Sequence, residues 1–141
     1  MLGLAAALPA AAGDAVLRGP VAARVVSVLD GDTLLVQAHL WLDQRLDVRV
    51  RLGGVDAPEL RGRCPGEREL ALRARAFVEA AVAGGEVDLT DIRYGKFARR
   101  VVARVAAAGV PDLSQGLLAR GLARPYDGGR RPDWCAPAGD P

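Results

Sequence analysis

Two short acidic segments contain the residues best suited to chemistry. Asp30-Gly31-Asp32-Thr33 holds two carboxylates, and Asp56-Ala57-Pro58-Glu59 holds two more. A hard divalent cation binds several oxygen ligands, and carboxylates at the ends of neighbouring strands can supply them together with a main-chain carbonyl and water. On this chemistry we predict Asp32 and Asp56 as metal ligands. Each segment taken alone is equally typical of an ordinary polar turn.

The residues around these segments predict strands. Between residues 24 and 36, β-branched and apolar residues are interrupted only by Asp30-Gly31-Asp32, which indicates two strands joined by a turn. Residues 48–52 alternate valine or leucine with arginine, which is the period of a strand. Arg51 therefore faces away from the valines, although polar residues near the mouth of a curved barrel also point inward.

Later segments add a helix, further strands and a second helix. Apolar residues from Pro65 to Ala83 recur at helical spacing, with the proline near the start and two glycines following. Residues 87–105 return to strand composition around a Tyr94-Gly95 turn, and leucines at 113–118 indicate a short helix. A helix after only the third strand suits a small closed barrel. We predict an α+β fold, a five-stranded OB-like β-barrel with two helices.

The composition limits the classes of protein to consider. A chain of 141 residues, half of them apolar, can bury one core but hardly two, so a single domain is expected. Its 19 basic and 17 acidic residues leave a net charge of +2, so any affinity for a polyanion must come from local clusters. One histidine and two widely separated cysteines do not match a zinc site. Few aromatic residues predict weak discrimination between base sequences.

The first residues are apolar and too few to span a bilayer. Ala10-Ala11-Ala12 is typical of a signal-peptidase site, although the positive first region of a signal peptide is missing. We predict that residues 1–18 are a signal-peptide remnant or a disordered leader, and that the protein is secreted or periplasmic. In an oxidising compartment Cys64 and Cys135 are expected to form a disulfide, and elsewhere they would be two free thiols.

In combination, the motifs resemble the staphylococcal nuclease (thermonuclease) family. The shared order is Asp-Gly-Asp-Thr, an arginine five residues before Asp-x-Pro-Glu, and Tyr-Gly followed by a basic residue. The resemblance covers about residues 21–126 and includes Gly116–Ala123, which is similar to the family's short helix and the Gly-Leu-Ala after it. It implies an OB-fold domain at residues 19–126 and a calcium-dependent hydrolase, an endonuclease and exonuclease acting on DNA and RNA with low sequence specificity.

The resemblance also implies roles for the acidic residues. Asp32 and Asp56 correspond to calcium-binding carboxylates, and the main-chain carbonyl of Ala57 corresponds to the third protein ligand. Glu59 corresponds to the carboxylate that orients or deprotonates the attacking water. Hydrolysis of a phosphodiester needs such an activated water and neutralisation of the charge that gathers on the phosphoryl oxygens.

Basic residues and one tyrosine are implied for the substrate. Arg51 and Lys96 correspond to the two residues that grip the scissile phosphate, Tyr94 corresponds to a residue of the nucleotide pocket, and Arg93 is expected to contact the phosphate backbone. The family has arginine where this chain has Lys96. A lysine offers a point charge in place of a bidentate fork, which costs roughly 1–3 kcal/mol of transition-state stabilisation. Arg100, of the same strand parity as Lys96, is the alternative contact.

The chain departs from the family in two further places. Residues 127–141 show no pattern for the family's final long helix, so another device must hold this tail. We predict a disulfide between Cys64 and Cys135 for that purpose, worth roughly 2–4 kcal/mol. The hairpin before Arg51 is longer than in the family, and its Trp41 is expected to pack on the barrel.

Two other functions remain to be distinguished. Some relatives keep the barrel as a nucleic-acid- or protein-binding module after losing the catalytic carboxylates, and the retained acidic residues argue against that reading here. A purely structural exported domain would bind no nucleic acid, and calcium would not change its melting temperature. No sequence feature indicates a stable protein partner or membrane association, so a monomer is expected.

Overall fold

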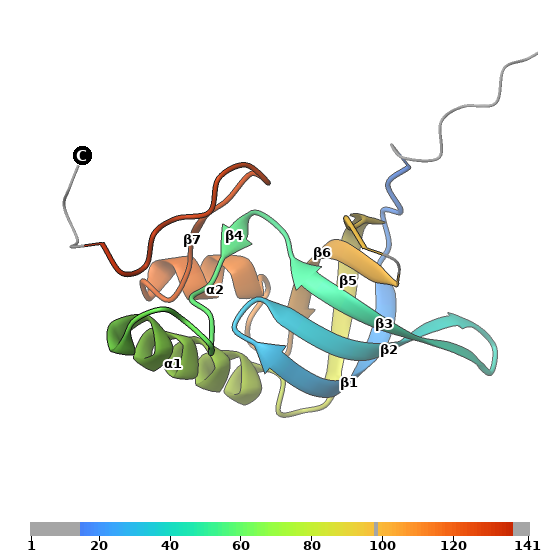
Figure 1. The fold of residues 1–141 in the computed structure, drawn as a ribbon. Coiled ribbons are helices and arrows are strands. Elements are labelled where there is room, and N and C mark those ends of the chain that lie inside the picture. Colours follow the sequence, from blue (N-terminus) through green and yellow to red (C-terminus); the bar gives the residue numbers. More distant parts are fainter. Residues whose placement is uncertain (1–14, 98, 137–141) are drawn as a thin grey trace, which may run out of the picture.

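A five-stranded closed barrel forms the body of the molecule (Figure 1). The computed structural model describes residues 15–97 and 99–136. The barrel order is β1–β2–β3–β6–β5, and β5 pairs back with β1. The strands are β1 (Val21–Asp30), β2 (Thr33–Trp41), β3 (Gln44–Leu52), β5 (Glu86–Tyr94) and β6 (Arg100–Ala107). Two helices, α1 (Pro65–Ala81) and α2 (Leu113–Ala119), complete the predicted α+β fold, which is confirmed.

The alternating pattern of residues 48–52 decides which side of β3 faces the core. Val48, Val50 and Leu52 are buried, as the alternation predicts, whereas Arg49 is exposed and Arg51 is half-buried. β3 pairs with β2 in antiparallel and with β6 in parallel orientation. The core therefore lies inside the barrel, and the carboxyl end of β3 carries Arg51 to the barrel mouth.

A short two-stranded pair lies outside the barrel. β4 (Val55–Asp56) pairs in antiparallel orientation with β7 (Arg124–Pro125), a contact that local periodicity did not predict. The pair brings the second acidic segment next to the segment after α2. It also directs the chain after Pro125 back across the residues that follow β3 (Figure 1).

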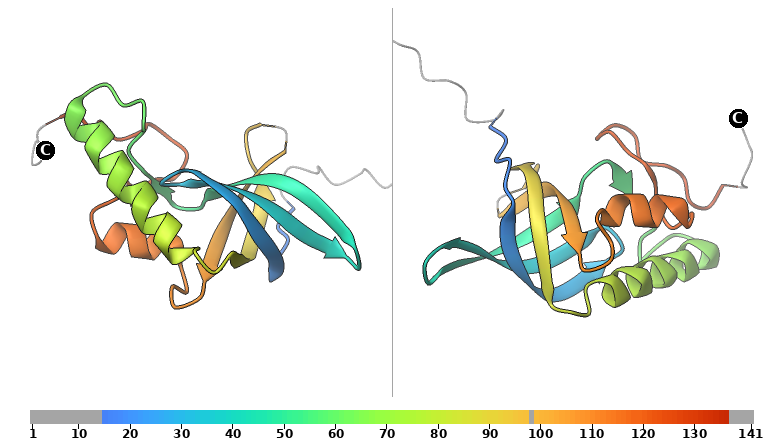
Figure 2. Two further views of the ribbon diagram at one scale, coloured as in Figure 1. Left: turned by 90° about the horizontal axis from the view of Figure 1, so that it is seen from below. Right: turned by 180° about the vertical axis from the view of Figure 1, so that it is seen from behind.

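The Asp30-Gly31-Asp32 turn rests on helix α1. A Cβ atom added at Gly31 would lie 2.7 Å from the Cβ of Ala74 and 3.1 Å from the Cβ of Ala57. Both distances are too short for an ordinary contact, so only glycine allows the turn to approach the helix this closely. The helix thereby fixes the depth at which Asp32 sits, and Figure 2 shows both helices on the same side of the barrel.

Residues 39–47 are strand for most of their length. β2 and β3 continue to a turn at Leu42 and Asp43, and in both views of Figure 2 this hairpin projects away from the helices. His39 is exposed on β2. The expectation that Trp41 packs on the barrel is wrong, because 73% of its surface is exposed. The hairpin is too long to fold its tip back on the core.

The predicted disulfide between Cys64 and Cys135 is present and holds the C-terminal tail, residues 126–136 of the described chain, against the start of α1. Trp134 anchors the same tail. Its indole is 9% exposed, its Nε1 donates a hydrogen bond to Asp56 Oδ2 at 3.2 Å, and the guanidinium of Arg124 lies 4.1 Å from the ring centroid. The tail is therefore secured by a covalent bond and by a buried aromatic side chain.

Most of the predicted leader lies outside the described residues, which begin at residue 15. Its last part joins the barrel, since the backbone of Leu17 pairs with that of Ile92 on β5. Neither helix in the described part of the chain has the length and hydrophobicity of a membrane span.

Replacing Gly31 by alanine should destabilise the fold through overpacking. We expect Gly31→Ala to lower the free energy of unfolding by about 1–3 kcal/mol, because the added methyl group clashes with Ala74. Gly66→Ala is the control, since a Cβ at that helical position meets no atom within 4 Å. Urea denaturation of both variants measures the difference. Equal effects of the two substitutions would contradict the close packing of the turn on α1.

The indole N–H of Trp134 should stabilise the buried carboxylate that accepts it. Trp134→Phe keeps an aromatic ring but removes this donor, so we expect a loss of about 1–3 kcal/mol in the free energy of unfolding. Trp41→Phe, at an exposed ring, should change it by less than about 0.5 kcal/mol. Both values come from chemical denaturation of the oxidised protein. A Trp134→Phe variant as stable as the Trp41→Phe control would rule out this hydrogen bond.

Candidate functional site

The predicted residues meet at one cleft of about 810 Å³. Its walls come from the β1–β2 turn, the end of β3, the segment after β4, the β5–β6 hairpin and the C-terminal tail. The predicted site residues that line it are Asp32, Arg51, Ala57, Glu59, Arg93, Tyr94, Lys96 and Arg100. Asp56 does not line the cleft, because it is fully buried beneath it.

Asp32 connects the two acidic segments. It is 5% exposed, and its Oδ2 accepts a hydrogen bond from the main-chain N–H of Ala57 at 2.9 Å. Its Oδ1 accepts a hydrogen bond from the Thr33 hydroxyl at 3.0 Å. The hydroxyl group of Thr33 thus helps to fix the orientation of the Asp32 carboxylate. The main-chain N–H of Ala57, the residue predicted to supply a carbonyl ligand, therefore faces the Asp32 carboxylate.

Asp30 shapes the turn between β1 and β2. Its Oδ1 accepts a hydrogen bond from the main-chain N–H of Asp32 at 3.1 Å. Burial, and after it the hydrogen bond and the negative charge of the Asp32 side chain, raise the pKa of Asp30 to about 7. Two crowded acidic groups at the rim of the cleft therefore favour a proton or another cation between them.

Arg51 neutralises both predicted metal ligands. Its Nη2 donates to Asp56 Oδ1 at 3.2 Å and lies 3.7 Å from Asp32 Oδ2. The same nitrogen donates to the carbonyl of Val55 at 3.3 Å, and the ring of Tyr126 lies 5.3 Å from the guanidinium. Asp32 and Asp56 thus converge on one nitrogen atom, although 24 residues of sequence separate them. The two carboxylates therefore lie close together, and their role as metal ligands stays a prediction.

Arg131, which the sequence analysis did not single out, occupies the acidic side of the cleft. Its Nε donates to Asp56 Oδ1 at 2.9 Å, its Nη2 donates to Asp56 Oδ2 at 3.4 Å, and its Nη1 pairs with Glu59 Oε1. Burial disfavours the charged guanidinium. The hydrogen bonds and the charges of the two carboxylates outweigh that effect, so the pKa of Arg131 lies above its ordinary value.

Glu67 fixes the loop that carries Glu59. It is a buried carboxylate in the first turn of α1, and it accepts hydrogen bonds from the main-chain N–H groups of Glu59 at 3.3 Å and Arg63 at 3.0 Å. A Cβ atom added at Gly62 would lie 2.5 Å from the Glu67 side chain, so the loop folds tightly over it. The side chain of Glu59 is half exposed and faces the cleft.

The opposite wall of the cleft is basic and lies mainly on the β5–β6 hairpin. Lys96 and Tyr94 are exposed, and Lys96 Nζ lies 3.5 Å from the carbonyl of Gly128 in the tail. Arg100 begins β6 and is half-buried, with the Phe97 ring 5.8 Å from its guanidinium. Arg100 is therefore held by a strand, whereas Lys96 lies in the connecting loop.

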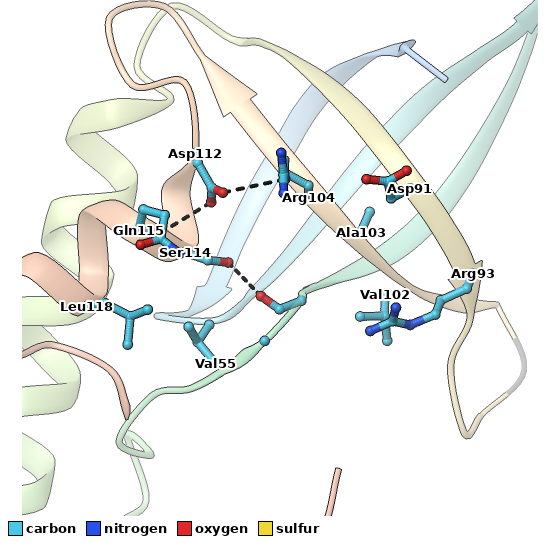
Figure 3. A pocket seen from close by; sticks show the side chains of 12 residues that line it. Val55, Asp91, Arg93, Val102, Ala103, Arg104, Asp112, Ser114, Gln115 and Leu118 are labelled. Atoms are coloured by element: carbon cyan, nitrogen blue, oxygen red, sulfur yellow. Dashed lines mark hydrogen bonds and ion pairs between the residues drawn. The ribbon is translucent and has the colours of Figure 1, made fainter. Parts of the chain in front are cut away.

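A second, smaller cavity of about 290 Å³ lies behind the β3–β4 connection and shares Arg93 with the cleft. Figure 3 shows two of its contacts: Arg104 lies 3.5 Å from Asp112, and the Ser114 hydroxyl donates to the carbonyl of Gly53 at 2.9 Å. Asp112 also caps α2 through the N–H of Gln115. These contacts anchor α2 to the barrel, so we assign this cavity a structural role.

The donor set fits a hard divalent cation, with one condition. Asp32 and Asp56 bring carboxylate oxygen atoms close together around Arg51, with the backbone of Ala57 beside Asp32. The condition is that Asp56 is covered by N–H donors, so a donor must leave before Asp56 can bind a cation. Within residues 15–97 and 99–136, one group of three acidic, cysteine or histidine side chains lies close enough to share an ion. It consists of Cys64, Glu67 and Cys135, and its two cysteines form the disulfide and so are not free thiolate ligands.

Local sequence patterns gave no signal for Arg131, Trp134 or Glu67. All three act through contacts that form only when the chain folds. The predicted disulfide is the one sequence feature that indicated where the tail lies. Cys64 lies five residues after Glu59, so a bond from Cys64 to Cys135 places the residues before Cys135 near the acidic segment.

Known proteins are similar in sequence to this chain over most of its length. The pattern of the family described as "Staphylococcal nuclease homologue" matches residues 49–133, more than half of the chain. A protein described as an uncharacterized endonuclease from Escherichia coli is 30% identical over 112 residues, 79% of this chain. One of the same description from Escherichia coli O157:H7 has the same identity and coverage, and this chain spans 65% of the length of each. From this match and from the predicted residues gathered at the mouth of its barrel, the chain belongs to the family of staphylococcal nuclease homologues.

Proposed function

We propose that this protein is a nuclease that hydrolyses phosphodiester bonds of DNA and RNA with low sequence specificity. One observation carries the proposal furthest: a single cleft has Asp32, Glu59 and the Arg51 that pairs with Asp32 on one side, and Lys96 and Arg100 on the β5–β6 hairpin. Acidic groups serve a cation and an attacking water, and basic groups bind the phosphate. Family membership and the endonuclease description of both relatives support the same activity.

Glu59 is the group best placed to orient or deprotonate water. Its carboxylate reaches the cleft, while its main chain is held from behind by Glu67. A base must sit within hydrogen-bond reach of the proton it removes, and a fixed backbone limits the positions its carboxylate can take. Arg131 now occupies one oxygen of Glu59, so this contact must loosen when water is bound there.

Arg51 and Arg100 are the proposed grips on the phosphate, with Lys96 as an additional charge. Arg51 is packed against Tyr126, and Arg100 is fixed at the start of β6. Held arginines offer forked donors at no cost of reorganisation, whereas an exposed lysine offers a mobile point charge. Tyr94 and Arg93, on the same hairpin, are proposed to contact the neighbouring nucleotide and its phosphate.

We propose Ca²⁺ as the cofactor, held by Asp32, Asp56 and the carbonyl of Ala57. A bound divalent cation supplies Lewis-acid polarisation of the phosphate. Export to an oxidising compartment is also proposed, as a secreted or periplasmic protein, and the disulfide between Cys64 and Cys135 supports it. Nothing in the described residues indicates a protein partner, and we propose a monomer.

Removal of the Glu59 carboxylate should abolish most cleavage. We expect Glu59→Gln to lower kcat at least about 100-fold, because the amide cannot accept the proton of the attacking water. The measurement is cleavage of a fluorescent single-stranded DNA in calcium, with and without a chelator. Glu69→Gln, at an exposed position of α1, is the matched control and should cleave like the parent protein. DNA binding without cleavage by the parent protein would instead identify a binding module.

Arg100 and Lys96, the two basic residues of the β5–β6 hairpin proposed to bind the phosphate, should contribute unequally to cleavage. We expect Arg100→Gln to lower kcat/KM about 100-fold and Lys96→Gln to lower it less, because the strand holds Arg100 in place and Lys96 is exposed. Arg99→Gln, at a neighbouring arginine that does not line the cleft, controls for net charge. Kinetics on the same DNA substrate check the order. A larger loss in Lys96→Gln would return the second phosphate contact to Lys96.

A further inference from the structure

The buried carboxylate of Asp56 has no acceptor position left for a metal ion. A carboxylate offers about four acceptor positions. Four N–H donors contact Asp56: Arg51 Nη2 and Arg131 Nε on Oδ1, and Arg131 Nη2 and Trp134 Nε1 on Oδ2. Arg131 supplies two of the four. Its departure would free a position on each oxygen, while Arg51 and Trp134 would still hold the carboxylate.

Arg131 is the donor best able to leave. Its side chain is 43% exposed, whereas that of Arg51 is 19% exposed and the Trp134 residue is 9% exposed. Arg51 is fixed to the carbonyl of Val55 as well as to Asp56. The side chain of Arg131, in contrast, makes hydrogen bonds and ion pairs with Asp56 and Glu59 alone among the described residues. A modest rotation of one exposed side chain would therefore open the acidic wall of the cleft.

The tail keeps Arg131 close to the site whether or not it is engaged. Four residues beyond it, Cys135 is bonded to Cys64, and between them Trp134 is buried and the carbonyl of Asp133 accepts a hydrogen bond from Arg124. Toward the other side, the carbonyl of Gly128 meets Lys96. A group tethered at both sides has a high effective concentration at its target.

We infer that the disulfide-tethered tail is an intramolecular competitor of the active-site cation, with Arg131 in the role of the competing charge. The inference rests on the proposed function, since it concerns the same acidic residues. With Arg131 engaged, Asp56 is saturated and Glu59 is paired, so neither is available. Calcium binding and Arg131 engagement exclude each other at Asp56, and each must weaken the other by the same factor.

The central test is calorimetric titration of the oxidised protein with CaCl₂, which needs no substrate. We expect Arg131→Gln to bind calcium at least about fivefold more tightly than the parent protein. Arg130→Gln is the matched control, because it removes the same charge one residue away. Arg130 is exposed, and no ion pair or side-chain hydrogen bond joins it to another described residue. An equal gain in both variants would reduce the effect to net charge and would overturn direct competition.

The tether is tested by a double-mutant cycle. Cys64→Ser/Cys135→Ser should also tighten calcium binding, and adding Arg131→Gln to it should give the affinity of Arg131→Gln alone, because the disulfide acts through Arg131. Independent, additive effects would overturn the role of the tether. Far-ultraviolet circular dichroism checks that the cysteine variant folds. Arg131→Gln keeps the disulfide and tests the competition whatever the result of that check.

Reciprocity gives a second measurement on the parent protein. By displacing Arg131 from Asp56, calcium should remove one of the contacts that hold the tail and speed reduction of the Cys64–Cys135 disulfide by a fixed concentration of thiol. It should not do so in Arg131→Gln. Calcium that protects the disulfide would overturn the inference. If the parent binds calcium and Arg131→Gln binds it no more tightly, only this inference fails. If no variant binds calcium, the proposed cofactor fails as well.

Discussion

The carboxylate of Asp56 is fully buried, and much of the surrounding structure serves to compensate its charge. An ionised carboxylate removed from water is costly unless charged and hydrogen-bonding groups replace the solvent. Its partners come from two distant parts of the chain: β3 supplies Arg51, and the tail supplies Arg131 and Trp134. One buried charge therefore links the barrel, the β4–β7 pair and the C-terminal segment into a single unit.

The same requirement explains why the tail is tied down. Trp134 and Arg131 can compensate Asp56 only while the tail lies across the segment after β4, and the disulfide to Cys64 holds it there. Glu67 works from the opposite side, where it holds the loop between Glu59 and Arg63 through main-chain hydrogen bonds. Buried polar groups that are fully paired fix one arrangement, because any alternative leaves a donor or acceptor unsatisfied. The acidic side of the cleft is rigid for this reason, and the exposed guanidinium of Arg131 is its most movable part.

Patterns in the sequence predicted the barrel and most of the residues that line its cleft. Alternation over residues 48–52 predicted the face of β3 that is buried, and apolar residues at helical spacing predicted α1 to within two residues at its end. Both signals are local, because they reflect how one element meets the core. The ordered motifs placed Asp32, Arg51 and Glu59 in one site, and the two cysteines predicted the disulfide.

The hydrogen-bond and ion-pair partners of those residues are visible only in the folded structure. The pairing of Arg131 with Asp56 spans 75 residues, and no spacing rule marks an arginine in a tail as a partner of a buried acid. The β4–β7 pair likewise depends on a distant segment, because it forms only where the chain after α2 returns to β4. Trp41 is exposed because it lies on a hairpin that extends beyond the barrel core. The local sequence pattern indicates whether a residue is buried or exposed. Which distant residue it pairs with depends on the packing of the whole chain.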